Sequence, residues 1–214
     1  LFGLDAHLNR GNPESEPNFR FLIKAFTSKD TSEKMETDLR INSLLIRHGK
    51  ITYDVLSEEE TPGKFNMNHI KLYNLIGDIS LKALKNDTLN VSVKRLGFDE
   101  QSGFELKELT LQLLGNEHNA RIENFKILLP GTSLRSSIYV NYDSITSFRQ
   151  FAEEARFLFE IHPSSCFTLQ DASPIIPTLA NFKEKMEIEA KADGTLNRLN
   201  CSEFHINVGD FIKT

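Results

Sequence analysis

The chain lacks several residue types that mark common classes of protein. It has no tryptophan and only two cysteines, Cys166 and Cys201, in 214 residues. Two cysteines so far apart fit neither a disulfide-rich framework nor the paired spacing of a zinc site. Cys201 falls on an apolar position of an expected strand, so we expect a small buried side chain there. The two thiols can pair only if the fold brings them together.

The charge pattern and the absence of a long apolar run exclude two further classes. The formal net charge is −5, and no cluster of Lys and Arg is visible of the kind that nucleic-acid phosphates require. No stretch of 18 apolar residues and no signal peptide is present. Apolar residues alternate from Phe2 to Leu8 and from Phe204 to Val208. We therefore expect a piece of a longer chain, with strands running into both ends.

Signatures of catalysis and of metal binding are also missing. There is no G-x-S-x-G, no P-loop and no G-x-G-x-x-G after a strand. The six histidines are scattered, and we expect each to be a surface or strand-edge residue: His7, His48, His69, His118, His162 and His205. The acidic runs at residues 58–60 and 153–154 are typical of solvated loops and helix faces. The sequence predicts no enzyme activity, no metal site and no cofactor.

What the chain does contain is a repeated short pattern, apolar-x-x-apolar-x-apolar. It occurs as Ile41, Leu44, Ile46; as Val93, Leu96, Phe98; as Leu106, Leu109, Leu111, Leu113; as Ile122, Phe125, Ile127, Leu129; as Leu196, Leu199, Cys201; and, fainter, as Leu72, Leu75, Gly77, Ile79. Residues two apart lie on one face of a strand, so each unit predicts a strand with one apolar face, preceded by a step or bulge. Repeated units predict an array of strands with a continuous apolar face.

These signals predict a mainly β protein with a few short helices, an α+β chain built on a curved, largely antiparallel sheet. We expect residues 1–214 to form one β-rich segment of a longer, repeat-like chain. Residues 39–46 predict a strand that bends or turns at His48 and Gly49 and resumes to Val55. Helical spacing predicts inserts or caps at residues 15–28 and 144–159, and a short proline-containing helix at about 171–179. Turn signals include Asp193-Gly194.

Four segments resemble one family of envelope proteins. They read FNMNHIKL at residues 65–72, LIGDISL at residues 75–81, LGFDEQSGFEL at residues 96–106 and DGTL at residues 193–196. In combination and order they resemble the translocation and assembly module proteins of Bacteroidetes, TamB and AsmA-like. The resemblance covers about residues 39–214, and we expect it to extend to Leu1.

The resemblance implies a fold and a function beyond what the periodicity predicts. Members of the family are long periplasmic rods, anchored in the inner membrane by an N-terminal helix that this chain lacks. Their strands curl into an apolar groove, a β-taco, that is thought to conduct phospholipid toward the outer membrane in outer-membrane biogenesis. The expected partners are phospholipid acyl chains and, through other parts of the full-length protein, an outer-membrane assembly barrel. Nothing in this chain resembles the C-terminal domain that meets the barrel.

Eleven apolar residues on the repeated strands are the candidates for lining such a groove. They are Leu72, Ile79, Val91, Val93, Leu106, Leu109, Leu111, Leu113, Ile122, Ile127 and Val140. Two alternatives remain open at this point. The helices expected near residues 18–28 and 145–159 could plug the groove and leave a closed spacer or docking domain. The segment could also be a protein-binding module that assists translocation and assembly of outer-membrane proteins, through a strand edge or a Phe-rich helix.

Overall fold

A computed structural model describes residues 1–20, 41–85, 88–116, 118–142 and 153–209. Ten strands form one sheet in these ranges. The strands are β1 (Asp5–Arg10), β2 (Ile41–Val55), β3 (His69–Lys85), β4 (Thr88–Glu100), β5 (Glu105–Gly115), β6 (Asn119–Leu128), β7 (Ser133–Asn141), β8 (Arg156–Thr168), β9 (Lys185–Thr195) and β10 (Arg198–Val208). Two short 3-10 turns, η1 (Leu169–Ala172) and η2 (Pro177–Leu179), follow β8.

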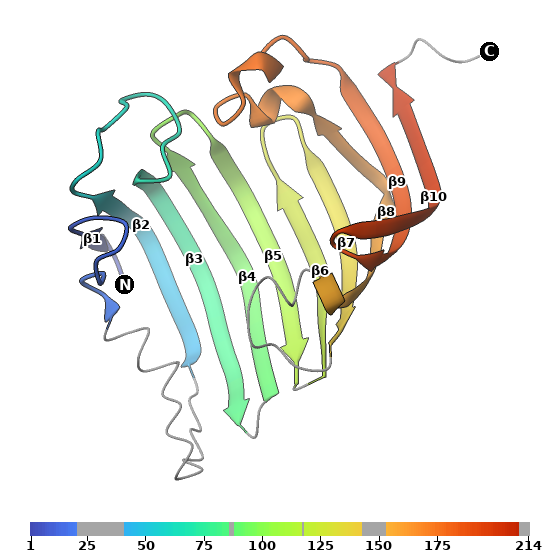
Figure 1. The fold of residues 1–214 in the computed structure, drawn as a ribbon, viewed down its shortest axis with the longest axis horizontal. Helices are drawn as coiled ribbons and strands as arrows, with labels where there is room; N and C mark the ends of the chain where they lie inside the picture. Colours follow the sequence, from blue (N-terminus) through green and yellow to red (C-terminus); the bar gives the residue numbers. More distant parts are fainter. Residues whose placement is uncertain (21–40, 86–87, 117, 143–152, 210–214) are drawn as a thin grey trace.

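The strands lie in the sheet in the same order as in the chain, from β1 to β10 (Figure 1). Every neighbouring pair from β2 to β10 is antiparallel, whereas β1 pairs with β2 in parallel. β1 and β10 are therefore the two edges of an unclosed sheet. The expected curved, largely antiparallel sheet is confirmed.

Five of the six apolar-x-x-apolar steps of the sequence are β-bulges, whereas the step from Leu196 to Leu199 falls at the turn between β9 and β10. In β2 the register shifts between Ile46 and Gly49, and His48 has a φ of 54°. In β3 it shifts between Tyr73 and Ile76, and Asn74 has a φ of 51°. A bulge adds one residue to a strand, so the apolar residues before and after it stay on the same face. The bent-strand interpretation of residues 39–55 is thus confirmed over Ile41–Val55, and the hairpin interpretation is wrong.

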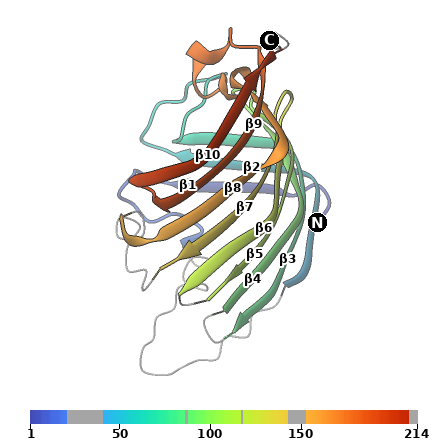
Figure 2. The ribbon, with the colours of Figure 1, turned by 90° about the vertical axis from the view of Figure 1, so that its right-hand side faces the viewer.

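Bulges recur in most of the antiparallel strands and curve the sheet. The register also shifts between Val93 and Leu96 in β4 and between Ile122 and Phe125 in β6, where Asn124 has a φ of 54°. The two residues inside each step point away from the apolar side and lengthen the opposite side of the strand. The strands therefore bend toward their apolar side, which becomes concave. Figure 2 shows this bend along the strands and the curl of the sheet toward β10.

The strands were predicted better than the helices. The helix predicted over residues 144–159 is wrong from residue 156 onward, because Arg156–Thr168 form β8. Leu158 and Phe159 therefore point to opposite faces of a strand. Alternating Phe157, Phe159 and Ile161 fit a strand as well as a helix, and pairing with β7 and β9 decides between them. Residues 153–154 are helical, and residues 143–152 lie outside the described residues.

Two further helices were predicted, at residues 15–28 and at about residues 171–179. In the segment predicted as a helix at residues 15–28, residues 15–19 are not helical, residue 20 is helical, and residues 21–28 lie outside the described residues. The short helix expected at about residues 171–179 is replaced by η1 and η2.

The turn predicted at Asp193-Gly194 is also wrong. β9 continues through Gly194 to Thr195, and the turn falls between Thr195 and Arg198, which are paired. Gly194 has a φ of +134°, and a Cβ there would lie 2.2 Å from the carbonyl oxygen of Arg198. The glycine therefore serves the close approach of β9 and β10 and not a turn.

The cysteines contradict one expectation. Cys166 in β8 is buried, whereas Cys201 in β10 is exposed, and both are free thiols. Cys201 does lie on the apolar face, opposite Ala192. It is exposed because β10 is an edge strand with a sheet neighbour on one side only. The expectation of a buried Cys201 is therefore wrong.

Candidate functional site

The candidate site is the concave apolar face of the sheet. Directly paired residues on neighbouring strands share a face, so the pairings trace rows across the sheet. One row crosses nine strands and contains Ile41, Leu81, Val91, Leu113, Ile122, Ile138, Phe159, Ala192 and Cys201. A second contains Leu44, Ile79, Val93 and Leu111, and a third contains Ile46, Gly77, Leu96, Leu109, Ile127 and Leu134.

The structure brings all of the sequence-predicted lining residues to this face. Eight stand in the three rows just given. Leu106 is paired with Phe98, and Val140 is paired with Phe157 on the same face. Leu72 is paired with Ile51. Leu106 and Val140 are buried, and the others are half-buried.

Several residues of the face were not among the predicted ones. They are Leu44, Ile46, Leu96, Phe98, Phe125, Leu134, Ile138, Phe157, Phe159 and Ile161. Those on β2, β4 and β6 belong to the repeated pattern, so the pattern itself was the signal that could have found them. Phe159 was missed because it was placed on a helix, and Leu134 and Ile138 because β7 has no apolar-x-x-apolar step.

No element in the described part of the chain forms a second layer over the concave face. The strands contact their sheet neighbours, and η1 and η2 lie beyond the end of β8 (Figure 1). Toward the β10 edge the apolar residues become exposed, with 59% of Phe204 and 42% of Ile206 accessible to solvent. The face is interrupted by a few polar residues, among them buried Glu100 and Ser136. Such a face can cover an elongated apolar ligand without specific polar contacts.

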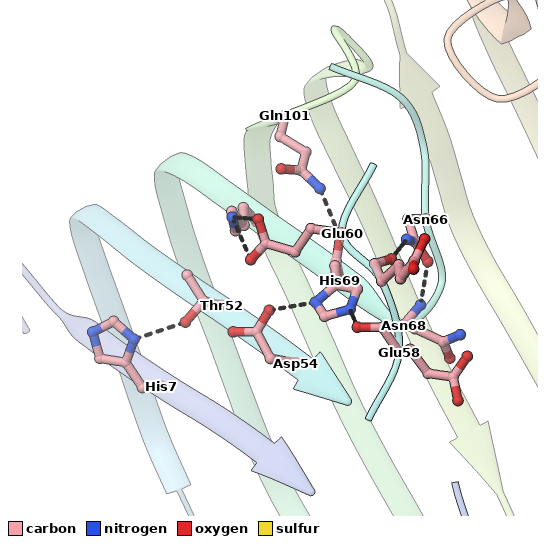
Figure 3. Close-up of polar contacts among 11 residues, drawn as sticks. His7, Thr52, Asp54, Glu58, Glu60, Asn66, Asn68, His69 and Gln101 are labelled. Atoms are coloured by element: carbon pink, nitrogen blue, oxygen red, sulfur yellow. Dashed lines mark hydrogen bonds and ion pairs between the residues drawn. The ribbon is translucent and has the colours of Figure 1, made fainter. Parts of the chain in front are cut away.

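A second cluster, of polar residues, joins β2, β3 and the loop between them (Figure 3). His69, at the start of β3, is 4% exposed. Its Nδ1 lies 2.8 Å from Oδ1 of Asp54, and its Nε2 lies 3.0 Å from the carbonyl oxygen of Glu58. Gln101 donates its amide to the carbonyl oxygen of His69 at 2.7 Å. The cluster therefore fixes the β2–β3 loop to the sheet.

The partners of His69 define its charge. A carboxylate and a carbonyl oxygen can only accept hydrogen bonds, so His69 satisfies both contacts only as an imidazolium, with both ring nitrogens donating. The hydrogen bond to Asp54 is the largest contribution that raises the pKa of His69 above its ordinary value of 6.5, and burial opposes it. The expectation that every histidine lies at the surface or a strand edge is wrong for His69.

The same cluster is the group of described residues that could hold a metal ion. Ligand atoms of Asp54, Glu60 and His69 all lie within 4.8 Å of one another. Both nitrogens of His69 are already donors, however, and Lys71 Nζ lies 3.2 Å from each carboxylate oxygen of Glu60. A metal would require His69 to lose a proton and Lys71 to leave. The donor set therefore fits a hydrogen-bonded loop anchor and not a metal centre.

Comparisons with known proteins leave the family resemblance without independent support. The chain matches no protein-family model, no curated protein and no solved structure. Among the described residues, no helix has both the length and the apolar character needed to cross a membrane.

Proposed function

We propose that this chain is a non-enzymatic segment of a periplasmic bridge that conducts phospholipid toward the outer membrane. The observation that carries the proposal is the apolar row that crosses the concave face without a break from Ile41 of β2 to Cys201 of β10, with two shorter rows beside it. In this proposal acyl chains lie on the concave face and the polar headgroups stay in water. The inner-membrane anchor and any contact with an assembly barrel belong to other parts of the full-length protein.

The size of the apolar face suits acyl chains. Neighbouring strands are about 4.8 Å apart, so the row from Ile41 to Cys201 follows a path of about 40 Å across the sheet. Each methylene group moved from water onto the face contributes about 0.8 kcal/mol. Because this contribution needs no specific polar contact, a lipid can shift along a row from one apolar side chain to the next. The mechanism needs no catalytic or polar ligand residue.

A pair of neighbouring residues on β5 tests the proposal directly. Leu111 lies on the concave face opposite Val93, whereas Thr110 lies on the other face and donates its hydroxyl to the carbonyl oxygen of Asn124 at 3.1 Å. A photo-crosslinking amino acid is placed at each position in turn, in the full-length protein in cells. Adducts are then identified by mass spectrometry. We expect phospholipid adducts at Leu111 and none at Thr110, which is the matched control.

The other outcomes contradict the proposal in different ways. Equal lipid capture at Leu111 and Thr110 would mean that lipid contacts the protein without regard to the apolar face. Protein adducts alone at Leu111 would mean that a polypeptide covers the face. No adduct at either position would mean that the concave face has no mobile occupant, and lipid conduction by this segment would be rejected.

A protein-binding module is the second candidate function, and the exposed edge of β10 favours it. All residues of Arg198–Val208 are exposed, and Phe204, Ile206 and Val208 continue the apolar face to the edge. An added strand from a client would extend the sheet by β-augmentation. Substituting Ile206→Pro removes a backbone donor from β10 and tests this candidate. Loss of client capture with unchanged lipid capture at Leu111 would favour the protein-binding function.

A further inference from the structure

A hollow on the convex side of the sheet combines positive charge with an apolar floor. It lies where the bulges of β2 and β4 stand on either side of β3. Arg47 and His48 line it from β2, and Lys94 and Arg95 line it from β4. A bulge directs two consecutive side chains to the same face, which explains how four basic side chains reach one hollow. It lies on the opposite face from the proposed lipid path.

In this hollow several cationic groups without an ion-pair partner in the described ranges stand close together. Some basic residues of the sheet form ion pairs, such as Lys126 with Glu108 at 2.7 Å and Lys191 with Glu203 at 3.2 Å, and others, such as Lys107 and Arg135, have none within the described ranges. Arg47, Lys94 and Arg95 have no ion pair with any residue in the described ranges. Neighbouring positive charges without counterions raise the local electrostatic potential and attract an anion.

One carboxylate also lines the hollow. Asp78 of β3 is paired in register with Arg95 and, on its other side, with Leu45. Three permanent positive charges, on Arg47, Lys94 and Arg95, still exceed this single negative charge. The hollow therefore remains net positive, and Asp78 weakens the binding of any anion.

The spacing and the floor of the hollow indicate the kind of anion. β2 and β4 are two strand spacings apart, about 10 Å, so their long basic side chains can converge above β3 on one group. A guanidinium binds a phosphate through two parallel hydrogen bonds. Between the charges, Leu45 is 46% exposed and Ile76 is 36% exposed. A free phosphate would leave these two side chains in water, whereas a lipid would cover them.

We propose that this hollow binds an anionic phospholipid, with its phosphate between Arg47 on one side and Lys94 and Arg95 on the other. The glycerol and the start of the acyl chains lie on Leu45 and Ile76. The proposal is independent of lipid conduction on the concave face, because its residues point to the convex side. In this proposal the convex side of the sheet has a binding site for a lipid headgroup, separate from the concave face.

The test is a titration of the isotope-labelled chain, followed by backbone amide signals in NMR spectra. The probes are sodium phosphate, zwitterionic dihexanoyl phosphatidylcholine and anionic dihexanoyl phosphatidylglycerol. We expect the anionic lipid to shift the amides of Arg47, His48 and Arg95, with an affinity about tenfold or more above those of the other two probes. Changes in the amide signals of Val93 and Leu111 report binding at the concave face separately.

Three variants make the outcome decisive. Arg47→Gln combined with Arg95→Gln should lower the affinity at the hollow about tenfold or more, without changing the shifts at the concave face. Asp78→Asn should raise the affinity, an effect that damage to the fold cannot produce. Arg135→Gln, on an exposed position of β7, is the matched control and should change nothing.

Several results would overturn the proposal. Equal affinity for sodium phosphate would mean that the apolar floor takes no part and that the hollow is a phosphate site only. Equal affinity for the zwitterionic lipid would mean that the net positive charge of the hollow does not select an anionic lipid. Unchanged binding of the anionic lipid in the Arg47→Gln, Arg95→Gln variant, or shifts at the concave face alone, would mean that the convex hollow binds no lipid.

Discussion

The two edges of the sheet are built in opposite ways. At the β1 edge, Asn18 folds back along the strand. Its backbone amide donates to the carbonyl oxygen of Asn9 at 2.8 Å, and its side chain accepts from the amide of Asn9 at 3.0 Å and donates to the carbonyl oxygen of His7 at 3.0 Å. At the β10 edge, every residue of Arg198–Val208 is exposed. No residue in the described ranges hydrogen-bonds along the outer side of β10 in this way.

The contrast shows where the sheet can accept another strand. Asn18 occupies the backbone groups that an added strand would need at β1, a form of edge protection. β10 leaves its outer backbone groups and its apolar side chains accessible. The strands near β1 are also better covered, since Leu75 of β3 is 3% exposed and Phe204 of β10 is 59% exposed. Among the described residues, strand addition is therefore open at β10 and opposed at β1, where Asn18 takes up backbone groups of His7 and Asn9.

The largest expected effect comes from a core residue near the β1 edge. Leu75→Ala should lower the free energy of unfolding by about 3 kcal/mol, because it removes a buried side chain and leaves a cavity. Chemical denaturation measures the change. Leu158→Ala, at a position that is 56% exposed on the opposite face of β8, is the matched control and should cost much less. Similar losses at both positions would mean that the two halves of the sheet are equally covered.

His69 should give the second largest effect, and this effect depends on pH. His69→Gln removes the charged donor to Asp54 and Glu58 and should cost about 2 kcal/mol at pH 6. The pKa of His69 is raised in the folded state, so its stabilisation is complete below its ordinary value of 6.5. It declines as the pH rises through the raised value.

Denaturation curves of both proteins over a range of pH check this prediction. The difference in stability between the wild type and His69→Gln should shrink toward alkaline pH. His205→Gln, on the exposed β10, is the control for the loss of an imidazole and should cost much less at pH 6. A gap between the wild type and His69→Gln that stays constant with pH would contradict the charged state assigned to His69.

Removing the protection of the β1 edge should have a smaller effect. Asn18→Ala loses the side-chain hydrogen bonds to Asn9 and His7 and should cost about 1 kcal/mol. Hydrogen exchange at the amide of Asn9 should accelerate. Asn207→Ala removes an exposed side-chain contact on β10, an amide 3.3 Å from Glu187, and serves as the control. Unchanged exchange at Asn9 would mean that Asn18 does not protect the edge.

The smallest effect is expected at the β10 edge itself. Phe204→Ala should change the free energy of unfolding by less than about 0.5 kcal/mol, because the side chain already lies largely in water. Thermal and chemical denaturation measure the change, with Leu75→Ala as the reference. A loss comparable to that of Leu75→Ala would show that a covering group buries Phe204 and would remove the contrast between the edges.

The repeated pattern predicted much of the sheet and of the candidate site. All of the lining residues chosen from it lie on one face, and its two-residue steps within strands are bulges, as at Tyr73 and Asn74. Both features are local, because side-chain alternation and a bulge involve residues a few positions apart. The prediction of a helix at residues 144–159 was wrong from residue 156 onward, because strand pairing depends on residues far apart in the sequence. Phe157 and Phe159 fit either period, and only the pairing with β7 and β9 makes them a strand.

The sequence by itself determined which residues of most strands share the apolar face, because alternation is a property of the extended chain. The tertiary structure alone decided the parallel pairing of β1 with β2, the burial of His69 beside Asp54 and the exposure of Cys201 at an edge. Each of these depends on residues far apart in the sequence or on the lack of a neighbouring strand. Local periodicity fixes the direction of a side chain, whereas its surroundings are set by the elements that the fold places against it.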